Sequence, residues 1–518
     1  MNAPVAIVGA GPVGLTAALL LARHGVPSVL FGARAHREPI GSRSICQQRE
    51  ALDVWSSVGV GDRIAAEGVT WSRARTFHGD RELFCLDLGG AGWSPYPPFV
   101  NISQSRTEQI LDEAVAAEPM VELRLGRPVT AITQYGDDVR LRTADGDQHA
   151  SYAVLAAGGR ADVLRDQLGV TFEGDSFDDR FLICDIRTDL GDWAEERRFY
   201  FDPVWNPGRQ VLIHPCPDST YRIDWQVPAG FDLDAEHASG ALEQRIRAII
   251  GDRPYDVVWQ SVYRFSSRVA SRMRAGRVLL AGDSAHVYSP FGARGLNSGV
   301  ADADNLAWKL AYVLRGWAPD ALLDSYHDER HTAALENLDV TAATMRFLIP
   351  PDGRAARYRR DVLERAGADP SARARVDSGR LSEAFWYDAS PLTTPSPAHP
   401  CGGRPPRGQV PSPAPGVLVP DQPLPGGTRL RALARDGFLA IAPPDQVAVT
   451  AEGLRELTDA PSRAIPFDGA LTEALGARPG ETWLIRPDAY VAAVTSLQSG
   501  RLADPLAGAV RRALGLRP

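Results

Sequence analysis

The stretch Gly276-Arg-Val-Leu-Leu-Ala-Gly-Asp-Ser-Ala-His286, which continues through Pro290-Phe-Gly-Ala-Arg-Gly-Leu-Asn-Ser-Gly299, says most about the fold. It predicts a buried strand, then an acidic turn, then a glycine-rich entry into a helix. In that geometry an Asp side chain can hold a ribityl-like polyol, while the amides at the helix N-terminus face a group that becomes anionic. The stretch therefore indicates one end of an extended ligand.

A second nucleotide-binding fingerprint opens the same chain. Gly9, Gly11 and Gly14 form a GxGxxG motif that follows an apolar strand at residues 4–8 and precedes a helix and a second strand at 26–31. That βαβ context gives the motif its meaning, because the glycines permit a tight turn and a close approach of backbone amides to a pyrophosphate. The two fingerprints together predict one ligand held at both ends.

Size and composition point to an ordinary multidomain globular protein. The 518 residues suggest two or three domains, and 44% hydrophobic with 23% charged residues is typical of globular chains. The net charge of −8 argues against nucleic acid or an anionic membrane as the main partner. No apolar run approaches the ~20 residues that span a bilayer. The five cysteines show no CxxC or metal spacing, and no signal peptide fits before the first strand, so we expect a cytoplasmic protein without a metal.

The pattern along the chain predicts a split nucleotide-binding domain in an α/β protein. Strand-like segments dominate between about 181 and 265, and a nucleotide-type strand returns at Val278–Ala281. A stretch dense in Pro, Ser and Gly then predicts an extended connector before a small α/β tail. We predict residues 1–180 and 268–388 as the nucleotide-binding domain, 181–267 as an inserted β-sheet domain with a contribution from 76–100, 389–415 as the linker and 416–518 as the tail domain.

One expected part of the first fingerprint is missing. The second strand normally ends in an acidic residue that binds the adenosine ribose, but in Ser28-Val-Leu-Phe-Gly-Ala-Arg34 that position is Gly32. Loss of a charge-assisted contact removes about 1.5–3 kcal/mol of binding free energy, which is tenfold or more in affinity. We expect Arg34 to meet the adenosine side or a phosphate.

Several segments carry a resemblance to a known family: Gly41-Ser-Arg-Ser-Ile-Cys46, Asn101-Ile-Ser-Gln-Ser105, Gly282-Asp283, and Pro290–Gly299 with Asp302, Asn305 and Trp308-Lys309. The chain resembles the class A (group A) FAD-dependent aromatic hydroxylases, of the p-hydroxybenzoate and phenol hydroxylase type. It is most similar to the subgroup of 3-(3-hydroxyphenyl)propionate and pentachlorophenol monooxygenases and polyketide hydroxylases. The resemblance extends from Val5 to about Tyr387, and more loosely through the tail.

The resemblance implies a fold, a cofactor and its contacts. The fold is α/β: a Rossmann-like FAD-binding domain of the glutathione-reductase type, an inserted β-sheet substrate domain and a C-terminal thioredoxin-like domain, here without CxxC. FAD is the cofactor, with NADPH or NADH as reductant. Asp283 would hold the ribityl chain, and the backbone amides after Arg294 would face the N1–C2=O edge of the isoalloxazine. The implied cofactor contacts are Gly9, Gly11, Gly14, Arg34, Arg43, Gln104, Asp283, Pro290, Gly295, Leu296 and Asn297.

A second departure from the family follows the strand-like segment Tyr152–Ala157. The family carries an Asp-Gly pair there that contacts FAD and NAD(P)H, whereas this chain has Gly158-Gly159. Asp162 comes four residues too late to be a simple replacement. With Gly32, two carboxylates are missing from one binding system, which leaves weakened NAD(P)H reduction as an alternative.

The inserted sheet would form a roof above the flavin. Period-two alternation in Tyr221-Arg-Ile-Asp-Trp-Gln226 places Tyr221 on one face and Asp224 on the other. One of the two faces would line an aromatic pocket. The candidate catalytic residues are His214, Tyr221 and Asp224, with Tyr263 as a further group near a substrate hydroxyl; packing within the sheet is the competing interpretation for each.

Three functions remain in competition. The first is a FAD-dependent monooxygenase that hydroxylates a phenolic or polyketide aromatic substrate through a flavin C4a-hydroperoxide, while the protein supplies placement, desolvation and charge stabilisation. The second is a non-redox cyclase, isomerase or dehydratase on the same fold with redox-silent or lost FAD, motivated by Gly32 and Gly158. The third is a ligand-binding or partner protein without turnover. A homodimer is left open.

Overall fold

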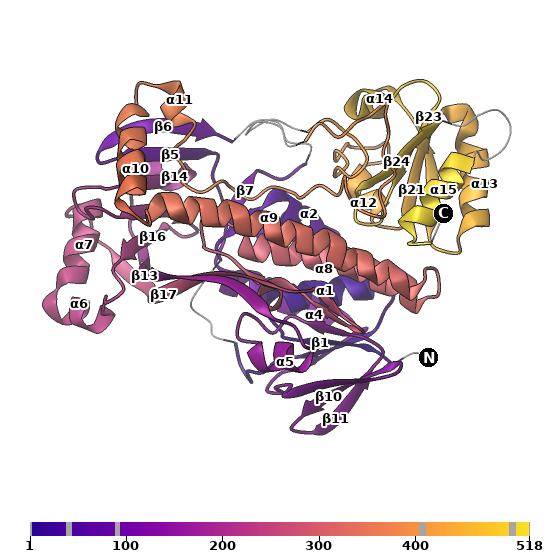
Figure 1. Ribbon diagram of the computed structural model, residues 1–518, viewed down its shortest axis with the longest axis horizontal. Coiled ribbons are helices and arrows are strands. Elements are labelled where there is room, and N and C mark those ends of the chain that lie inside the picture. Colours follow the sequence, from indigo (N-terminus) through magenta and orange to yellow (C-terminus); the bar gives the residue numbers. More distant parts are fainter. Residues whose placement is uncertain (1–2, 38–43, 89–93, 404–410, 497–503, 517–518) are drawn as a thin grey trace.

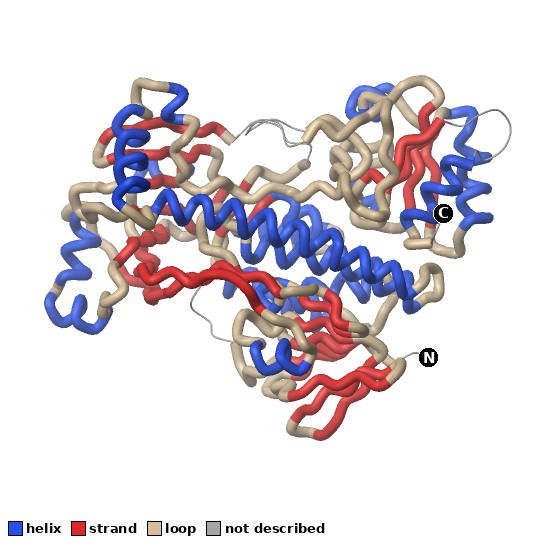
Figure 2. The backbone as a smooth tube through the Cα atoms, in the orientation of Figure 1, coloured by secondary structure: helices blue, strands red, loops and turns tan. Residues whose placement is uncertain are grey.

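The computed structural model describes residues 3–37, 44–88, 94–403, 411–496 and 504–516. Two long helices, α8 (Gly295–Leu314) and α9 (Asp324–Leu348), run across the middle of the molecule (Figure 1), with strands on both sides of them (Figure 2). The mixed α/β fold class is therefore confirmed. No helix in these ranges is long and apolar enough to cross a membrane.

A six-stranded sheet underlies the nucleotide-binding region. Its order is β18-β19-β12-β1-β2-β8. The central strands β1 (Val5–Val8), β12 (Ala153–Leu155) and β19 (Val278–Leu280) are parallel and fully buried, as their short apolar runs predict. The other strands are β2 (Ser28–Phe31), β8 (Val121–Arg124) and β18 (Arg274–Ala275).

Helix α1 (Pro12–Arg23) packs directly on α8 beside this sheet. Glycine permits the close approach, because a Cβ on Gly299 of α8 would lie 2.5 Å from Val13 Cγ2 and 3.2 Å from the Gly282 Cα. Both fingerprints of the sequence therefore lie next to each other in space, although more than 250 residues separate them.

An eight-stranded sheet, in the order β20-β17-β13-β16-β15-β14-β5-β6, forms the second layer. Its strands are β5 (Arg73–His78), β6 (Arg81–Asp87), β13 (Phe172–Arg187), β14 (Glu196–Phe201), β15 (Gln210–Cys216), β16 (Thr220–Val227), β17 (Asp256–Ala270) and β20 (His286–Val287). The long strands β13 and β17 run through positions 180 and 268, where the sequence suggested domain limits. The helices α6 (Leu233–Ser239) and α7 (Ala241–Ile250) lie inside the segment that was expected to be β-rich.

Smaller sheets and helices complete this part of the chain. The three-stranded sheets are β3-β7-β4 and β11-β10-β9, built from β3 (Cys46–Gln48), β4 (Val69–Thr70), β7 (Phe99–Asn101), β9 (Ala131–Tyr135), β10 (Asp138–Thr143) and β11 (Gly146–Ala150). The helices are α2 (Arg49–Ser56), α3 (Gly61–Glu67), α4 (Gln104–Ala117), α5 (Asp162–Gln167), α10 (Gly353–Arg365) and α11 (Pro370–Arg373). The strand β3 is set by pairing with the distant β7.

The C-terminal domain, residues 416–516, has a four-stranded sheet in the order β22-β21-β23-β24. Its elements are α12 (Leu430–Ala434), β21 (Phe438–Ala442), α13 (Val447–Leu457), β22 (Ser462–Pro466), α14 (Gly469–Leu475), β23 (Glu481–Ile485), β24 (Val491–Ser496) and α15 (Asp504–Ala513). The order is compatible with a thioredoxin-like domain, which stays a prediction. Trp308 and Tyr312 of α8 share one hydrophobic cluster with Phe438, so the domain packs against the body (Figure 1).

The connector before this domain is packed rather than free. Leu392 is buried in the same hydrophobic cluster, and the backbone N–H of Thr394 donates to the carbonyl of Ala492 at 2.8 Å. Its proline content suits an extended chain that lies along the C-terminal sheet.

Candidate functional site

Three glycine turns meet at the carboxyl edge of the six-stranded sheet. Gly9 follows β1, Gly158 comes shortly after β12 and Gly282 comes shortly after β19; their φ angles are 116°, 81° and 57°. Because these three strands are parallel neighbours, the chain leaves all of them at the same edge. An edge of this kind is where open α/β sheets bind ligands.

The glycines of the first fingerprint have different roles. A Cβ on Gly9 would lie 2.1 Å from the carbonyl oxygen of Ala156, and a Cβ on Gly14 would lie 1.9 Å from that of Gly9, so both positions require glycine for packing. A Cβ on Gly11 would meet no heavy atom within 4 Å. Gly11 also begins α1 without a side-chain cap. The first turn of α1 therefore offers open space and unsatisfied amides, which suits a phosphate.

The second fingerprint presents a carboxylate and a helix N-terminus to the same edge. Asp283 is exposed in the single turn Gly282–Ser284, whereas Gly282 itself is buried. Helix α8 begins at Gly295 without a side-chain cap, so the amides of Gly295, Leu296 and Asn297 have no partner within the helix. A Cβ on Gly295 would meet nothing within 4 Å. These residues fit a flavin whose ribityl hydroxyls need an acceptor and whose N1–C2=O edge becomes anionic.

The side chain of Asn297 has a structural role that the sequence did not suggest. Its Nδ2 donates to the carbonyls of Cys46 at 3.0 Å and Ala293 at 2.6 Å, and its Oδ1 accepts from the backbone N–H of Gln48 at 3.1 Å. The side chain thus joins β3 to the start of α8, and only the backbone amide of Asn297 remains for a cofactor.

The other predicted cofactor contacts are scattered around this edge. Gln104 begins α4, and its Oε1 accepts from the backbone N–H of Ser44 at 3.2 Å. Arg34 lies exposed beyond β2, and Pro290 is exposed in the loop before α8. Arg43 lies outside the described residues, so its role stays a prediction.

The two missing carboxylates have different structural causes. A Cβ on Gly32 would lie 2.7 Å from Leu125 Cδ2 and 3.1 Å from the Ala10 Cβ, so a side chain there requires Leu125 to move. A Cβ on Gly158 would meet no heavy atom within 4 Å, but the φ of +81° is one that side chains rarely adopt. A carboxylate at the first position therefore requires Leu125 to shift, and backbone conformation disfavours a carboxylate at the second.

The eight-stranded sheet separates the three candidate catalytic residues. On adjacent strands, His214 of β15 pairs with Arg222 of β16, and Leu212 pairs with Asp224, so His214 and Asp224 share one face. Tyr221 points to the other face, where it is buried in a cluster that includes Ile246 of α7. The structure thus keeps Tyr221 and Asp224 on opposite faces, as the alternation in the sequence predicts, and α7 covers the face of Tyr221. The catalytic role of each of the three residues stays a prediction.

The face that carries His214 and Asp224 is turned towards the loop before α8. Phe291 of that loop contacts Phe181 of β13 edge-on with ring centroids 5.4 Å apart, and Phe199 of β14 at 6.1 Å. Phe199 pairs with Leu212, and Tyr263 pairs with Phe181, which places all of them on this face. We call it the roof face.

Several polar atoms on the roof face have no hydrogen-bond partner among the described residues, His214 Nδ1 and Asp224 Oδ1 among them. Their neighbour Arg222 is instead occupied by Asp185, with two bonds of 2.7 and 2.8 Å. Burial, followed by the charges of Arg197 and Arg222, holds the pKa of His214 well below its usual value. Burial and repulsion from Asp185 raise the pKa of Asp224 to about 7, against the opposing pull of the two arginines. Asp224 can therefore accept or donate a proton near neutral pH, whereas His214 stays neutral and can contribute a hydrogen bond.

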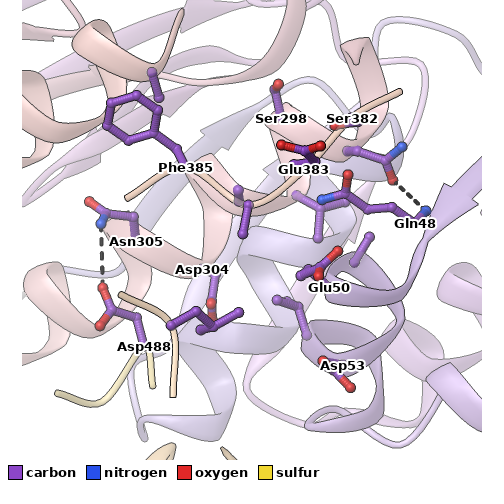
Figure 3. A pocket seen from close by; sticks show the side chains of 18 of the residues that line it. Gln48, Glu50, Asp53, Ser298, Asp304, Asn305, Ser382, Glu383, Phe385 and Asp488 are labelled. Carbon is purple, nitrogen blue, oxygen red and sulfur yellow. Dashed lines mark hydrogen bonds between the residues drawn. The ribbon is translucent and has the colours of Figure 1, made fainter. Parts of the chain in front are cut away.

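A separate pocket lies between α2, α8 and the C-terminal domain (Figure 3). Carboxylates from all three surround it, and Asp304 pairs with Arg435 at 2.7 Å. Burial raises the pKa of Asp304 to about 6, although Arg435 opposes this. Asn305 Nδ2 donates to Asp488 at 3.4 Å across the junction. The pocket includes Asn297 in its wall but none of the glycine turns, so it belongs to the domain junction.

The described residues hold no cluster of His, Cys, Asp and Glu that could bind a metal ion. All five cysteines are free thiols. Asp302 and Asn305 lie in the segments that carry the family resemblance, but the sequence alone indicates no role for either residue. The structure places Asp302 directly behind the Gly282–Asp283 turn, where its backbone and side-chain partners come from distant parts of the chain.

Known proteins with similar sequences are flavoproteins. The family model described as "FAD binding domain" matches residues 2–341. The 3-(3-hydroxy-phenyl)propionate/3-hydroxycinnamic acid hydroxylase of Mycobacterium sp. (strain KMS) is 31% identical over 417 residues, which is 77% of this chain and 69% of that protein. The rifampicin monooxygenase of Streptomyces venezuelae is 34% identical over 358 residues, which is 68% of this chain and 73% of that protein.

Solved structures share the fold over nearly the whole chain. The flavin-dependent monooxygenase PieE, in complex with FAD and substrate, matches with a TM-score of 0.84 at 24% identity over 99% of both chains. Aklavinone-11 hydroxylase, in complex with FAD and aklavinone, matches with a TM-score of 0.76 at 25% identity over 99% of this chain and 100% of that one. The resemblance stated from the sequence is confirmed, and the chain belongs to the FAD binding domain family, among the class A FAD-dependent aromatic hydroxylases.

Proposed function

We propose that this protein is a FAD-dependent monooxygenase that hydroxylates a phenolic or polyketide aromatic substrate at the expense of NADPH or NADH. The observation that carries the proposal is the convergence of Gly11, Asp283 and the uncapped start of α8 on one sheet edge, below a roof face that carries aromatic rings and the unpartnered atoms His214 Nδ1 and Asp224 Oδ1. Bound FAD supplies the redox chemistry and the activation of oxygen.

The chain's own residues place the cofactor and the substrate. The first turn of α1 binds the pyrophosphate, Asp283 accepts hydrogen bonds from the ribityl chain, and the amides of Gly295 and Leu296 stabilise negative charge at the flavin edge. Asp224 accepts the proton of the substrate hydroxyl, because a phenolate is the more electron-rich ring for attack by an electrophilic oxygen, and neutral His214 hydrogen-bonds to the substrate. The aromatic side chains of the roof face exclude water from the reacting centre.

The relatives named above are hydroxylases and monooxygenases, which does not favour the non-redox alternative. The five free thiols support our proposal of a reducing, cytoplasmic setting. A homodimer also stays a proposal.

The test uses the purified protein with FAD, NADPH or NADH, and a panel of phenols and polyketide aromatics. We expect at least one compound to accelerate NAD(P)H oxidation and to give a hydroxylated product that carries one ¹⁸O atom from ¹⁸O₂. A product that forms without oxygen and without reductant would instead establish the non-redox alternative. Binding of aromatic compounds without any turnover would overturn both.

A further inference from the structure

The Gly282–Asp283 turn is held from behind by one buried carboxylate. Asp302 lies on α8 with no exposed side-chain surface. Its Oδ2 accepts from the backbone N–H of Gly282 at 2.9 Å and lies 2.7 Å from His286 Nε2. The two contacts reach residues before and after Asp283 in the chain. The position of the turn relative to α8 therefore depends on Asp302.

The second oxygen of Asp302 joins the turn to the start of α8 through Arg330 of α9. Arg330 Nε donates to Asp302 Oδ1 at 2.8 Å, and its Nη2 donates to the carbonyl of Ser298 at 3.2 Å. The remaining nitrogen, Nη1, donates to the Tyr387 hydroxyl at 3.0 Å. Arg330 therefore contacts both elements that face the proposed flavin: the acidic turn, through Asp302, and the first turn of α8 directly.

The charges of this cluster are not an efficient source of stability. Burial alone would raise the pKa of Asp302, but His286 and Arg330 outweigh burial and hold that pKa below its usual value, so the carboxylate stays ionised. Apolar residues of similar volume often stabilise a core as well as a buried ion pair does. The better supported use of such pairs is to select one arrangement of the surrounding elements.

We propose that Asp302 and Arg330 are positioning residues that hold the Asp283 carboxylate and the amides of Gly295–Asn297 in one arrangement, and thereby set the affinity for the flavin half of FAD. Neither residue touches the cofactor in this account. The inference rests on the proposed FAD site, and the experiment separates the two.

The experiment compares FAD with ADP as probes on the deflavinated full-length protein. ADP occupies only the end at the Gly9–Gly14 turn, whereas FAD also needs Asp283 and the start of α8. We expect Asp302→Asn to raise the Kd for FAD at least tenfold and to leave the Kd for ADP within twofold. Arg330→Met is the second variant, with the same expected change in the FAD-to-ADP ratio, and serves if Asp302→Asn does not fold.

Glu329→Gln is the matched control. Glu329 is the neighbour of Arg330 on α9 and is equally buried, but it pairs with Lys309 and Arg486 rather than with the turn. We expect this variant to lower the melting temperature and to leave the FAD-to-ADP ratio of Kd values unchanged. A ratio that rises tenfold in Glu329→Gln would overturn the inference, because any loss of a buried charge would then suffice.

The variant Asp283→Ala distinguishes failure of the positioning inference from failure of the proposed FAD site. If it weakens FAD tenfold or more while Asp302→Asn and Arg330→Met leave FAD binding unchanged, only the positioning inference fails. If Asp283→Ala also leaves the Kd for FAD unchanged, the proposed site itself fails. Equal weakening of FAD and ADP by Asp302→Asn and Arg330→Met would show a general structural loss and would overturn the inference.

Discussion

Arg486 of the C-terminal domain donates from Nη2 to Glu329 Oε2 of α9 at 3.0 Å, and neither side chain has any exposed surface. Lys309 of α8 donates to the same oxygen at 2.7 Å. Burial opposes ionisation of Glu329, but Arg486 and Lys309 outweigh it and lower its pKa, whereas burial lowers the pKa of Lys309 to about 8. The C-terminal domain is therefore joined to the body by charges that water cannot reach.

Removal of Arg486 should destabilise the protein. We expect Arg486→Met to lower the free energy of unfolding by about 3–5 kcal/mol, because Lys309 would then be the one remaining ion-pair partner described for the two buried carboxylates of Glu329 and Asp488. Chemical denaturation at pH 7 measures the change. The double variant Arg486→Met with Glu329→Gln should recover part of the loss, and a single-variant effect below about 0.5 kcal/mol would contradict the account.

The contact of Asp283 with the ribityl chain predicts a loss of FAD affinity. Asp283→Ala should cost about 1.5–3 kcal/mol of binding free energy, the range for a charge-assisted hydrogen bond, which raises the Kd tenfold or more. Titration of flavin fluorescence gives the Kd. Asp252→Ala removes an exposed carboxylate before β17 and is the control, with no expected change.

Asp224 should act as a base on the roof face. With its pKa at about 7, we expect kcat/KM to rise as the pH passes 7 and then to level off. Asp224→Asn should lose this rise and about 10²–10⁴ in rate. Tyr221→Phe is the matched control, because Tyr221 lies on the opposite face; a loss of activity there comparable to that of Asp224→Asn would refute the assignment.

The same carboxyl group predicts how stability changes with pH. Its pKa is about 7 in the folded protein and about 3.9 in an unfolded chain, so the folded state binds the proton more tightly. Stability therefore decreases as the pH rises from about 4 to about 7, by up to ~4 kcal/mol at 1.36 kcal/mol per pKa unit. Denaturation curves of Asp224→Asn at pH 5 and pH 8 should lack this contribution, and identical pH dependence in both proteins would exclude it.

A carboxylate at position 32 should restore the missing contact with the adenosine ribose only when a second substitution makes room for it. Gly32→Asp alone should not improve FAD affinity, because its Cβ would lie 2.7 Å from Leu125 Cδ2. Gly32→Asp combined with Leu125→Ala should lower the Kd for FAD about tenfold, the lower end of what such a contact contributes. Leu125→Ala alone is the control, and improvement by the single Gly32→Asp change would show that packing at this position is not limiting.

The sequence predicted the nucleotide-binding half well because its signals are local. The turns at Gly9–Gly14 and Gly282–Asp283 each lie between a short apolar strand and a helix, and the short-range pattern is sufficient to recognise them. The period-two pattern of β16 also separated Tyr221 from Asp224 correctly. It could not show which face meets the flavin loop, because that depends on α6 and α7, whose helical pattern was missed in a strand-rich segment.

The buried ion pairs could not be predicted from the sequence, for a different reason. Asp302 and Arg330 are 28 residues apart, and Glu329 and Arg486 are 157 apart. Nothing in the local sequence distinguishes such residues from solvated charges on a helix surface. The strand β3 could not be predicted from its local sequence either, because its partner β7 comes some 50 residues later.

A crystal structure of the protein with bound FAD tests the central claim most directly. The account predicts the pyrophosphate at the first turn of α1, a ribityl hydroxyl within hydrogen-bond distance of Asp283, and the N1–C2=O edge against the amides of Gly295–Asn297. An isoalloxazine ring located elsewhere, for example in the pocket at the C-terminal junction, would contradict it.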